Sequence, residues 1–254
     1  MHLRYEINPP KLIKNNVLLD DYKIQDLLES INNNIYTITK KCSGIHITDS
    51  VLGIPRISPL ILSSIVKNNC KNIEITTSLR IRDRNFTSIT QYMYDSILLN
   101  INGILLINGD KPLLESKDFD LSPSKIVKHF KQIGIMDKID LFLSIPSNPD
   151  FDRIKNKIES EPTGFITQIV NEVEQVSTIV DNLKPQGFKI IPCILLPSSN
   201  NLKSALKLNF DWSNYQYRIL DFIRDIYNIS KDMIITSPND FVYAKNVIHN
   251  LLGL

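Results

Sequence analysis

Glycine is scarce in this sequence, and its scarcity excludes one large class of binding sites. Only eight glycines occur among 254 residues, about half the usual share. Neither a G-x-G-x-x-G nor a G-x-x-x-x-G-K pattern is present. These patterns form the turns whose backbone N–H groups hold phosphates in dinucleotide-binding and P-loop proteins. We therefore expect no glycine-rich phosphate loop.

Cysteine pairs, an excess of one charge and long apolar runs are lacking as well. Cys42, Cys70 and Cys193 are odd in number and form no Cys-x-x-Cys pair, which favours reduced thiols over a disulfide framework or a cysteine metal site. The net charge of +2 predicts no binding to nucleic acid or to an anionic membrane. No signal-like segment begins the chain, and no run approaches the roughly 18 apolar residues of a membrane span. We expect a cytoplasmic protein without a bound metal.

What the sequence does contain is a regular alternation of strand-like and helix-like segments. Apolar residues make up 43% and charged residues 22%, as in a globular protein with a substantial core. Short β-branched runs predict strands at 2–7, 44–48, 72–79, 103–108, 139–145, 164–170, 188–195 and 232–236. Segments of helical period predict helices at 21–33, 58–68, 86–100, 122–133, 151–160, 171–183, 201–208, 215–228 and 239–253.

Eight strand–helix units in about 250 residues are what a (β/α)₈ TIM barrel requires. We therefore predict an α/β fold, with residues 1–254 forming a single barrel domain. The alternative is a doubly wound open sheet, which would normally carry a phosphate-binding turn after its first strand. The first strand here is followed by Pro9 and Pro10, so the barrel is favoured.

The barrel prediction gives meaning to the polar residues at strand ends, because chemistry in such barrels gathers at the carboxyl ends of the strands. Glu6 ends the first strand, since proline cannot continue a ladder. Asp49 and Asp110 follow the second and fourth strands. Neighbouring carboxylates in a partly closed pocket raise one pKa, which keeps a carboxylic acid protonated near neutral pH. This pattern predicts an enzyme with an acid at the barrel mouth.

Each of these residues also has a plainer interpretation. Glu6 could be a solvated strand end, and Asp110 could cap a turn after Asn108–Gly109. His46 is expected one layer below the rim as a buried, hydrogen-bonded histidine. The arginines at 80, 82 and 84 are interpreted as a solvated loop with Asp83 as its cap.

Five segments in order carry a family resemblance: "YEINPPK" (5–11), "RDRN" (82–85), "GILLINGDKP" (103–112), "GFITQ" (164–168) and "IPCILLP" (191–197). Together they resemble methylenetetrahydrofolate reductase, a flavin-dependent barrel of one-carbon metabolism linked to methionine biosynthesis. The resemblance implies that the chain is an oxidoreductase acting on CH–NH groups. FAD would be its cofactor and NADH or NADPH its electron donor. Methylene-tetrahydrofolate, or a related reduced pterin, would be its substrate.

By the same resemblance, the catalytic acid falls on Glu6 and the substrate-binding residues on Asp110 and Gln168. The cofactor contacts fall on Thr48, Asp49, Ser78, Asn108, Gly109, Asp110, Asp150, Arg153 and Lys157. Ser78 stands where the family commonly has histidine, and the fifth-strand loop lacks the family's usual His-Pro pair.

These departures leave two alternatives open: a partner-dependent pterin-binding subunit that lacks its own flavin, and a pterin methyltransferase barrel. For the protein as a whole, the expected assembly is a homo-oligomer or a complex with a partner subunit.

Overall fold

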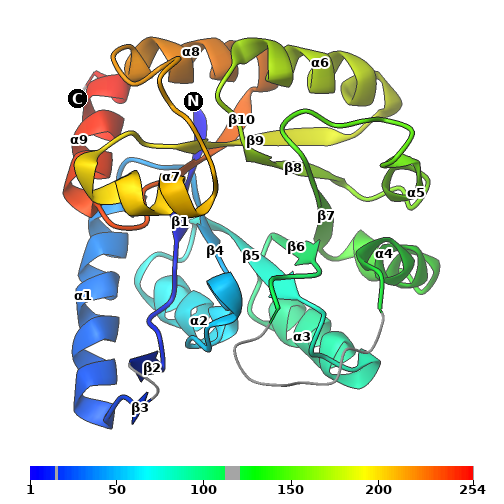
Figure 1. Cartoon of the computed structure of the whole chain (residues 1–254). Helices are drawn as coiled ribbons and strands as arrows, with labels where there is room; N and C mark the ends of the chain where they lie inside the picture. The colour runs from blue at the N-terminus through cyan, green and yellow to red at the C-terminus, as the bar shows by residue number, and fades with distance from the viewer. Residues whose placement is uncertain (15–16, 112–120, 254) are drawn as a thin grey trace.

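Eight parallel strands close into a barrel in this computed structural model, which describes residues 1–14, 17–111 and 121–253 (Figure 1). Around the barrel the strands follow one another in the order β1-β10-β9-β8-β7-β6-β5-β4. They are β1 (His2–Ile7), β4 (Gly44–Ile47), β5 (Glu74–Arg80), β6 (Gly103–Ile107), β7 (Asp140–Ile145), β8 (Gly164–Ile169), β9 (Lys189–Leu195) and β10 (Asp232–Thr236). The predicted (β/α)₈ barrel, in a single domain, is confirmed.

Helices surround the strands on the outside of the barrel (Figure 1). They are α1 (Asp21–Thr39), α2 (Pro59–Asn69), α3 (Phe86–Leu98), α4 (Pro123–Gln132), α5 (Lys155–Ile158), α6 (Val173–Leu183), α7 (Leu202–Lys207), α8 (Ile219–Ser230) and α9 (Phe241–Leu252). Gly253 ends α9 at φ +67, as the sequence predicted. Within the described residues, no helix is both long enough and apolar enough to cross a membrane.

Several local features differ from the sequence prediction: α1 continues to Thr39 instead of ending at 33, and α8 begins at Ile219 instead of 215. A small antiparallel hairpin, β2 (Ile13–Lys14) with β3 (Val17–Leu18), follows the proline pair and was not expected. The helix expected over 151–160 is reduced to α5, a single turn. Its expected first turn is replaced by a tight turn in which the Asp150 carboxylate accepts hydrogen bonds from the backbone N–H groups of Asp152 and Arg153.

The interior of the barrel is divided into an apolar half and a polar half. The apolar half is a separate cluster inside the ring of strands, made of Leu105, Phe142, Ile166, Ile191, Cys193 and Ile234. The polar half comes from β1, β4 and β5, whose inward residues include Arg4, Glu6, His46, Thr76, Ser78 and Arg80.

The strand register also shows which side chains share a level inside the barrel. In a barrel of this type each layer has about four side chains, drawn from alternate strands, and the pairing advances about one residue per strand. When this rule is applied to the observed strand pairs in turn, Glu6, Ser78, Ser144 and Cys193 lie in one layer. After one full circuit of the barrel the pairing leads back to Glu6. One layer of the interior therefore contains a carboxyl, two hydroxyls and a thiol.

Candidate functional site

Glu6 is the central residue of the site at the carboxyl ends of the strands. Its side chain is half-buried, and its Oε1 accepts a 2.6 Å hydrogen bond from Thr236 Oγ1 on the neighbouring β10. Burial raises the pKa of this carboxyl, while the Thr236 hydrogen bond opposes the rise. The charge of Glu6 in turn contributes to the raised pKa of the Cys193 thiol, whose main cause is burial. This electrostatic coupling agrees with the shared layer.

His46 lies one layer below and supports the site from beneath. Its Nδ1 is 2.9 Å from Thr76 Oγ1 and its Nε2 is 2.9 Å from Ser78 Oγ. Burial, with a smaller contribution from Arg4, lowers the pKa of His46 to about 3. The imidazole is therefore neutral, and the prediction of a buried, hydrogen-bonded histidine is confirmed. The same contact holds Ser78, a predicted cofactor residue, in place.

Thr48 and Asp49 follow β4 and are buried. Thr48 Oγ1 donates a 2.7 Å hydrogen bond to Asn8 Oδ1. Asp49 Oδ2 accepts one from the backbone N–H of Arg80 at 3.0 Å and one from Arg84 Nη2 at 3.2 Å. Asp49 thus joins the loop after β4 to the end of β5.

Arg80 is not part of a solvated loop, so that interpretation was wrong for this residue. Its side chain is 3% exposed, and its Nε lies 3.1 Å from Asp83 Oδ1. Asp83 was expected to cap the loop, but it pairs with Arg80, and the cap of the following helix is Asn85. The alternation of Thr76, Ser78 and Arg80 along β5 places all three on the inward face. That alternation is visible in the sequence and could have located Arg80.

The loop after β6 holds three predicted residues, Asn108, Gly109 and Asp110. Asn108 contributes its backbone carbonyl, which accepts from the N–H of Arg82. Gly109 has φ +81 and packs against the stem of Arg80. Asp110 is exposed, and its Oδ2 accepts a 2.9 Å hydrogen bond from the backbone N–H of Leu52, in the turn after β4. The loops after β4, β5 and β6 are therefore linked at one side of the mouth.

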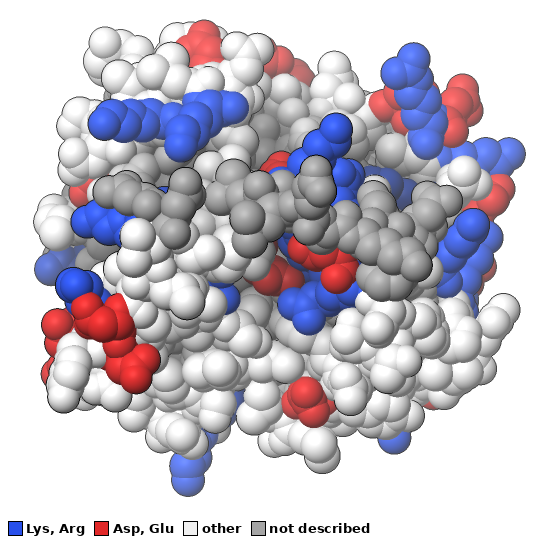
Figure 2. Space-filling model, turned by 60° about the horizontal axis from the view of Figure 1, so that its bottom comes forward, with Lys and Arg blue, Asp and Glu red and all other residues white. Residues whose placement is uncertain are grey.

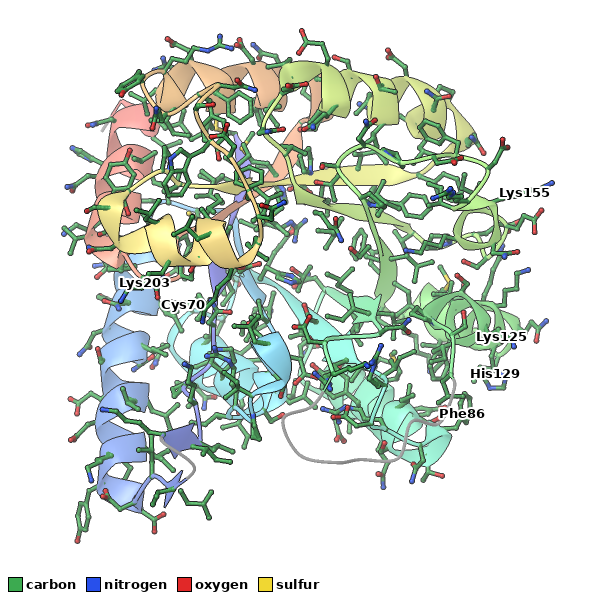
Figure 3. All side chains as sticks on the ribbon, in the orientation of Figure 1. Cys70, Phe86, Lys125, His129, Lys155 and Lys203 are labelled. Carbon is green, nitrogen blue, oxygen red and sulfur yellow. The ribbon has the colours of Figure 1, made fainter. Side chains whose placement is uncertain are left out.

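The remaining predicted residues are spread more widely. Asp150 and Arg153 pair with each other on the surface, where the Arg153 side chain is 87% exposed. Lys157 reaches back to donate a hydrogen bond to the backbone carbonyl of Ser144, and burial lowers its pKa. Lys155, on the same short helix, points away from the molecule in Figure 3. Gln168 is exposed near the end of β8.

The structure thus brings Glu6, Ser78, Thr48, Asp49 and the Gly109 loop to one part of the mouth. Acidic and basic side chains gather at the centre of this face, which comes forward in Figure 2. Two residues were not assigned a role from the sequence although they contact the site: Thr236, which bonds Glu6, and Arg80. No group of three or more metal-binding side chains occurs within the described part of the chain.

Two cavities lie at opposite ends of the barrel. A cleft of about 260 Å³ lies between the carboxyl ends of β1 and β10 and the helices α1 and α9, and its lining includes Tyr5, Glu6, Ile35, Ile38 and Phe241. A larger cavity of about 620 Å³ lies at the amino-terminal end. It is walled by ion pairs that Arg4 makes with Asp232 and Glu74. The smaller cleft is at the carboxyl end, where chemistry in these barrels occurs, but it lies on the helix side of β1 and not inside the ring of strands.

Comparison with known proteins gives structural likeness only. No family model matches the chain, and no curated protein matches it. Among solved structures, a chain of the tryptophan synthase α2β2 complex from Pyrococcus furiosus is 9% identical with a TM-score of 0.58, covering 100% of this chain and 98% of that one. A point mutant of the tryptophan synthase α subunit from the same organism is 11% identical with a TM-score of 0.58 and the same coverage. An Aquifex aeolicus protein is 11% identical with a TM-score of 0.57, covering 98% of this chain and 91% of that one. At this identity the likeness establishes the fold and nothing finer.

These findings correct the reading drawn from the family resemblance. The similar structures reported above that carry a protein name are tryptophan synthase structures and not flavin-dependent reductases, and no family model matches. Membership of the methylenetetrahydrofolate reductase family was therefore a wrong prediction. Three predictions that depended on this membership were therefore wrong as well: the oxidoreductase activity, the flavoprotein class and the role in one-carbon metabolism. The two pterin-binding alternatives are also dropped, because no pterin substrate is supported.

The physical reason for the error lies in the motifs. Asp83 and Arg84 of "RDRN" make contacts within the protein, and Asn85 caps α3, so folding alone accounts for these residues. Pro112 of "GILLINGDKP" lies outside the described residues. FAD and the nicotinamide donor rested on the resemblance alone, and no contact in the structure tests them.

Proposed function

We propose that this barrel is an acid–base enzyme in which Glu6 gives and takes a proton at the barrel mouth. One observation carries the proposal: burial raises the pKa of Glu6, which has a hydroxyl and no cation as its hydrogen-bond partner among the described residues. A raised pKa brings a carboxyl closer to the range that general acid–base catalysis favours.

The other inward or buried carboxylates differ from Glu6 in this respect. Asp49 is bonded to Arg84, and Asp232 forms a pair with Arg4 at 2.9 Å. Hydrogen bonds from His2 and Arg4 help to keep the pKa of Asp232 low although burial alone would raise it. Both carboxylates are bonded to arginines, and these ion pairs serve the structure. Glu6 is the carboxyl whose surroundings favour a mobile proton.

The test is a pH titration of protein with ¹³C-labelled glutamate side chains, followed by NMR. We expect the Glu6 carboxyl to titrate at higher pH than an ordinary glutamate. Thr236→Val should raise the Glu6 pKa further, because the lost hydrogen bond favours the ionised form. A Glu6 carboxyl that titrates in the ordinary range would contradict the proposal.

Catalysis itself is tested by proton exchange. The protein is incubated in D₂O with a panel of small carbonyl compounds, and deuterium gained at carbon is read by mass spectrometry. Glu6→Gln should lower the rate of the exchange that wild type catalyses by about two to four orders of magnitude. The melting temperature of the variant should be unchanged. Exchange at the wild-type rate in Glu6→Gln would exclude Glu6 as the acid–base group.

We also propose a cytoplasmic location, since Cys42, Cys70 and Cys193 are all free thiols. The tryptophan synthase structure is that of an α2β2 complex. By analogy with that complex, we propose that this chain also works with a partner subunit. Sedimentation of the purified chain, alone and in extract of its source cells, tests this point.

A further inference from the structure

Arg80 is a buried charged side chain, and two of its nitrogen atoms lack hydrogen-bond partners within the described part of the chain. It is the last residue of β5 and is 2% exposed. Its Nε is bonded to Asp83, but neither Nη1 nor Nη2 has a hydrogen-bond partner among the described residues, and both atoms are buried. A guanidinium carries five N–H donors and stays charged at any physiological pH. Buried donors of this kind are normally paired, so four unpaired N–H groups require an explanation.

The carboxylates around Arg80 do not supply the missing acceptors. Asp83 bonds the Nε only, and Asp49 bonds the backbone N–H of Arg80 together with Arg84. Asp110 lies on the adjoining loop, but its carboxylate is exposed and bonded to Leu52. These carboxylates therefore bind the Nε and the backbone N–H of Arg80, and they leave its Nη1 and Nη2 atoms without an acceptor.

The backbone after β6 fixes the direction of that edge. A Cβ on Gly109 would lie 2.5 Å from Arg80 Cγ and 2.9 Å from Arg80 Cδ, so only glycine lets the loop pack so closely on the arginine stem. Gly109 also has φ +81, a conformation that suits glycine. With the stem packed on this loop and the Nε bonded to Asp83, Arg80 is held in one orientation before any ligand arrives. An ordered donor pair of this kind loses little entropy when it binds.

Arg84 shows what a purely structural arginine looks like in the same loop. Its Nε donates to the Arg80 carbonyl and its Nη2 to Asp49. Its side chain is 31% exposed, so water can reach it. The Nη1 and Nη2 atoms of Arg80 have neither a hydrogen-bond partner among the described residues nor exposure to water.

We propose that Arg80 binds the oxyanion, a carboxylate or a phosphoryl group, of the small molecule on which Glu6 acts. Two parallel N–H donors on a planar guanidinium match two oxygens of such a group. Arg80 and Glu6 lie on the inward faces of β5 and β1, with only β4 between these strands, and both are near the carboxyl ends. The inference rests on the proposed acid–base function for the identity of the ligand, and it names that ligand as an anion.

The experiment uses inorganic phosphate and acetate as separate probes, each titrated into the whole chain against potassium chloride at equal ionic strength. Binding is read from the NMR signals of the Arg80 guanidinium and from the melting temperature. We expect phosphate or acetate to shift the Arg80 signals and raise the melting temperature. The probe that binds more tightly identifies the group as phosphoryl or carboxylate. If neither probe moves the Arg80 signals of wild type, the inference is overturned.

Variants assign the binding to Arg80. Arg80→Gln should weaken it by about tenfold or more, while Arg224→Gln, which changes a surface arginine of α8 paired with Asp221, should leave it intact. Unchanged binding in Arg80→Gln overturns the inference. Should Arg80→Gln fail to fold, Arg80→Lys keeps the charge but loses the two-pronged geometry. It should then bind more weakly than wild type, and wild-type affinity in Arg80→Lys counts against the inference.

The two proposals fail in different ways. If wild type binds neither phosphate nor acetate while its Glu6 pKa is raised, only the Arg80 inference is overturned. An ordinary Glu6 pKa with intact anion binding would remove the acid–base function and leave the anion site standing.

Discussion

The charge on His46 is decided by its surroundings. Both ring nitrogens face hydroxyl groups, on Thr76 and Ser78, and the ring is buried. A hydroxyl can either donate or accept, so both contacts suit a neutral ring with one protonated nitrogen. Arg4, the nearby cation, further disfavours protonation. His46 is therefore a positioning residue for Ser78, which lies in the same layer as Glu6.

We expect His46 to stay neutral down to a pH of about 3 in the folded protein. An unfolded histidine titrates near 6.5, so the folded pKa is depressed. Above pH 6.5 the ring is neutral in both the folded and the unfolded protein, and the free energy of unfolding has its full value. As the pH falls from 6.5 toward 3, only the unfolded protein takes up the proton, so the free energy of unfolding declines. In His46→Gln this part of the acid loss should be missing, because glutamine does not titrate.

Two measurements check this expectation. Nitrogen NMR of the His46 ring reports its charge directly, and urea unfolding of wild type and His46→Gln between pH 7 and pH 4 reports the stability. Equal dependence of unfolding free energy on pH in both proteins would show that His46 does not contribute to acid unfolding.

At the scale of single elements, the segment from Arg80 to α3 is organised by short-range contacts. Asn85 is the N-cap of α3, and its Oδ1 accepts a 2.9 Å hydrogen bond from the backbone N–H of Ser88. Asp83 and Arg84 bond to Arg80 within the same turn. The cap starts the helix where the arginine loop ends, so it also fixes the position of that loop.

Asn85→Ala should destabilise the protein by about 0.5–2 kcal/mol, the usual cost of removing an N-cap side chain. Asn85→Ser should recover most of that loss, because serine can accept the same hydrogen bond. The free energy of unfolding in urea gives both values. An alanine variant as stable as the serine variant would mean that the cap contributes nothing.

The elements themselves could be predicted from the sequence because their patterns are local. All eight barrel strands lie where β-branched runs were found, and β1 and β10 agree at both ends. The one-turn α5 could not be predicted in this way. Its segment has a helical period, but the Asp150 side chain bonds the next backbone N–H groups and holds a turn instead.

The candidate site was only partly predictable, for the same physical reason. Glu6 could be found because prolines mark its strand end. Arg80 was misread because three arginines in one loop look solvated, and its burial depends on Gly109, which is distant in sequence. Thr236 comes from the opposite end of the chain, so only barrel closure brings it to Glu6. Family likeness added error here, because motif residues that build turns and caps were read as binding residues.

At the scale of the whole molecule, barrel closure depends on a layer of small residues at the amino-terminal end. The same register rule that groups Glu6 with Ser78 places Gly44, Gly103 and Gly164 in one layer with Asp232. The aspartate is paired with Arg4. The three glycines give neighbouring strands and side chains room to approach one another. This end of the barrel therefore serves stability, while the opposite end carries the candidate chemistry.

Alanine at each glycine should destabilise the barrel in an order set by what the new Cβ meets. At Gly164 the Cβ would lie 2.1 Å from the Lys189 carbonyl oxygen, which is backbone and cannot move without opening β8 from β9. At Gly103 it would lie 2.7 Å from a ring carbon of Phe142, and at Gly44 it would lie 3.1 Å from the Glu74 carbonyl oxygen. We therefore expect Gly164→Ala to lose most stability, at or above the roughly 1–3 kcal/mol typical of overpacking, and Gly44→Ala to lose least. Urea unfolding midpoints of the three variants give the order, and the slope of each transition shows whether the barrel still unfolds as a unit. If Gly164→Ala proved as stable as Gly44→Ala, close approach of β8 and β9 would not be what limits the packing of this layer.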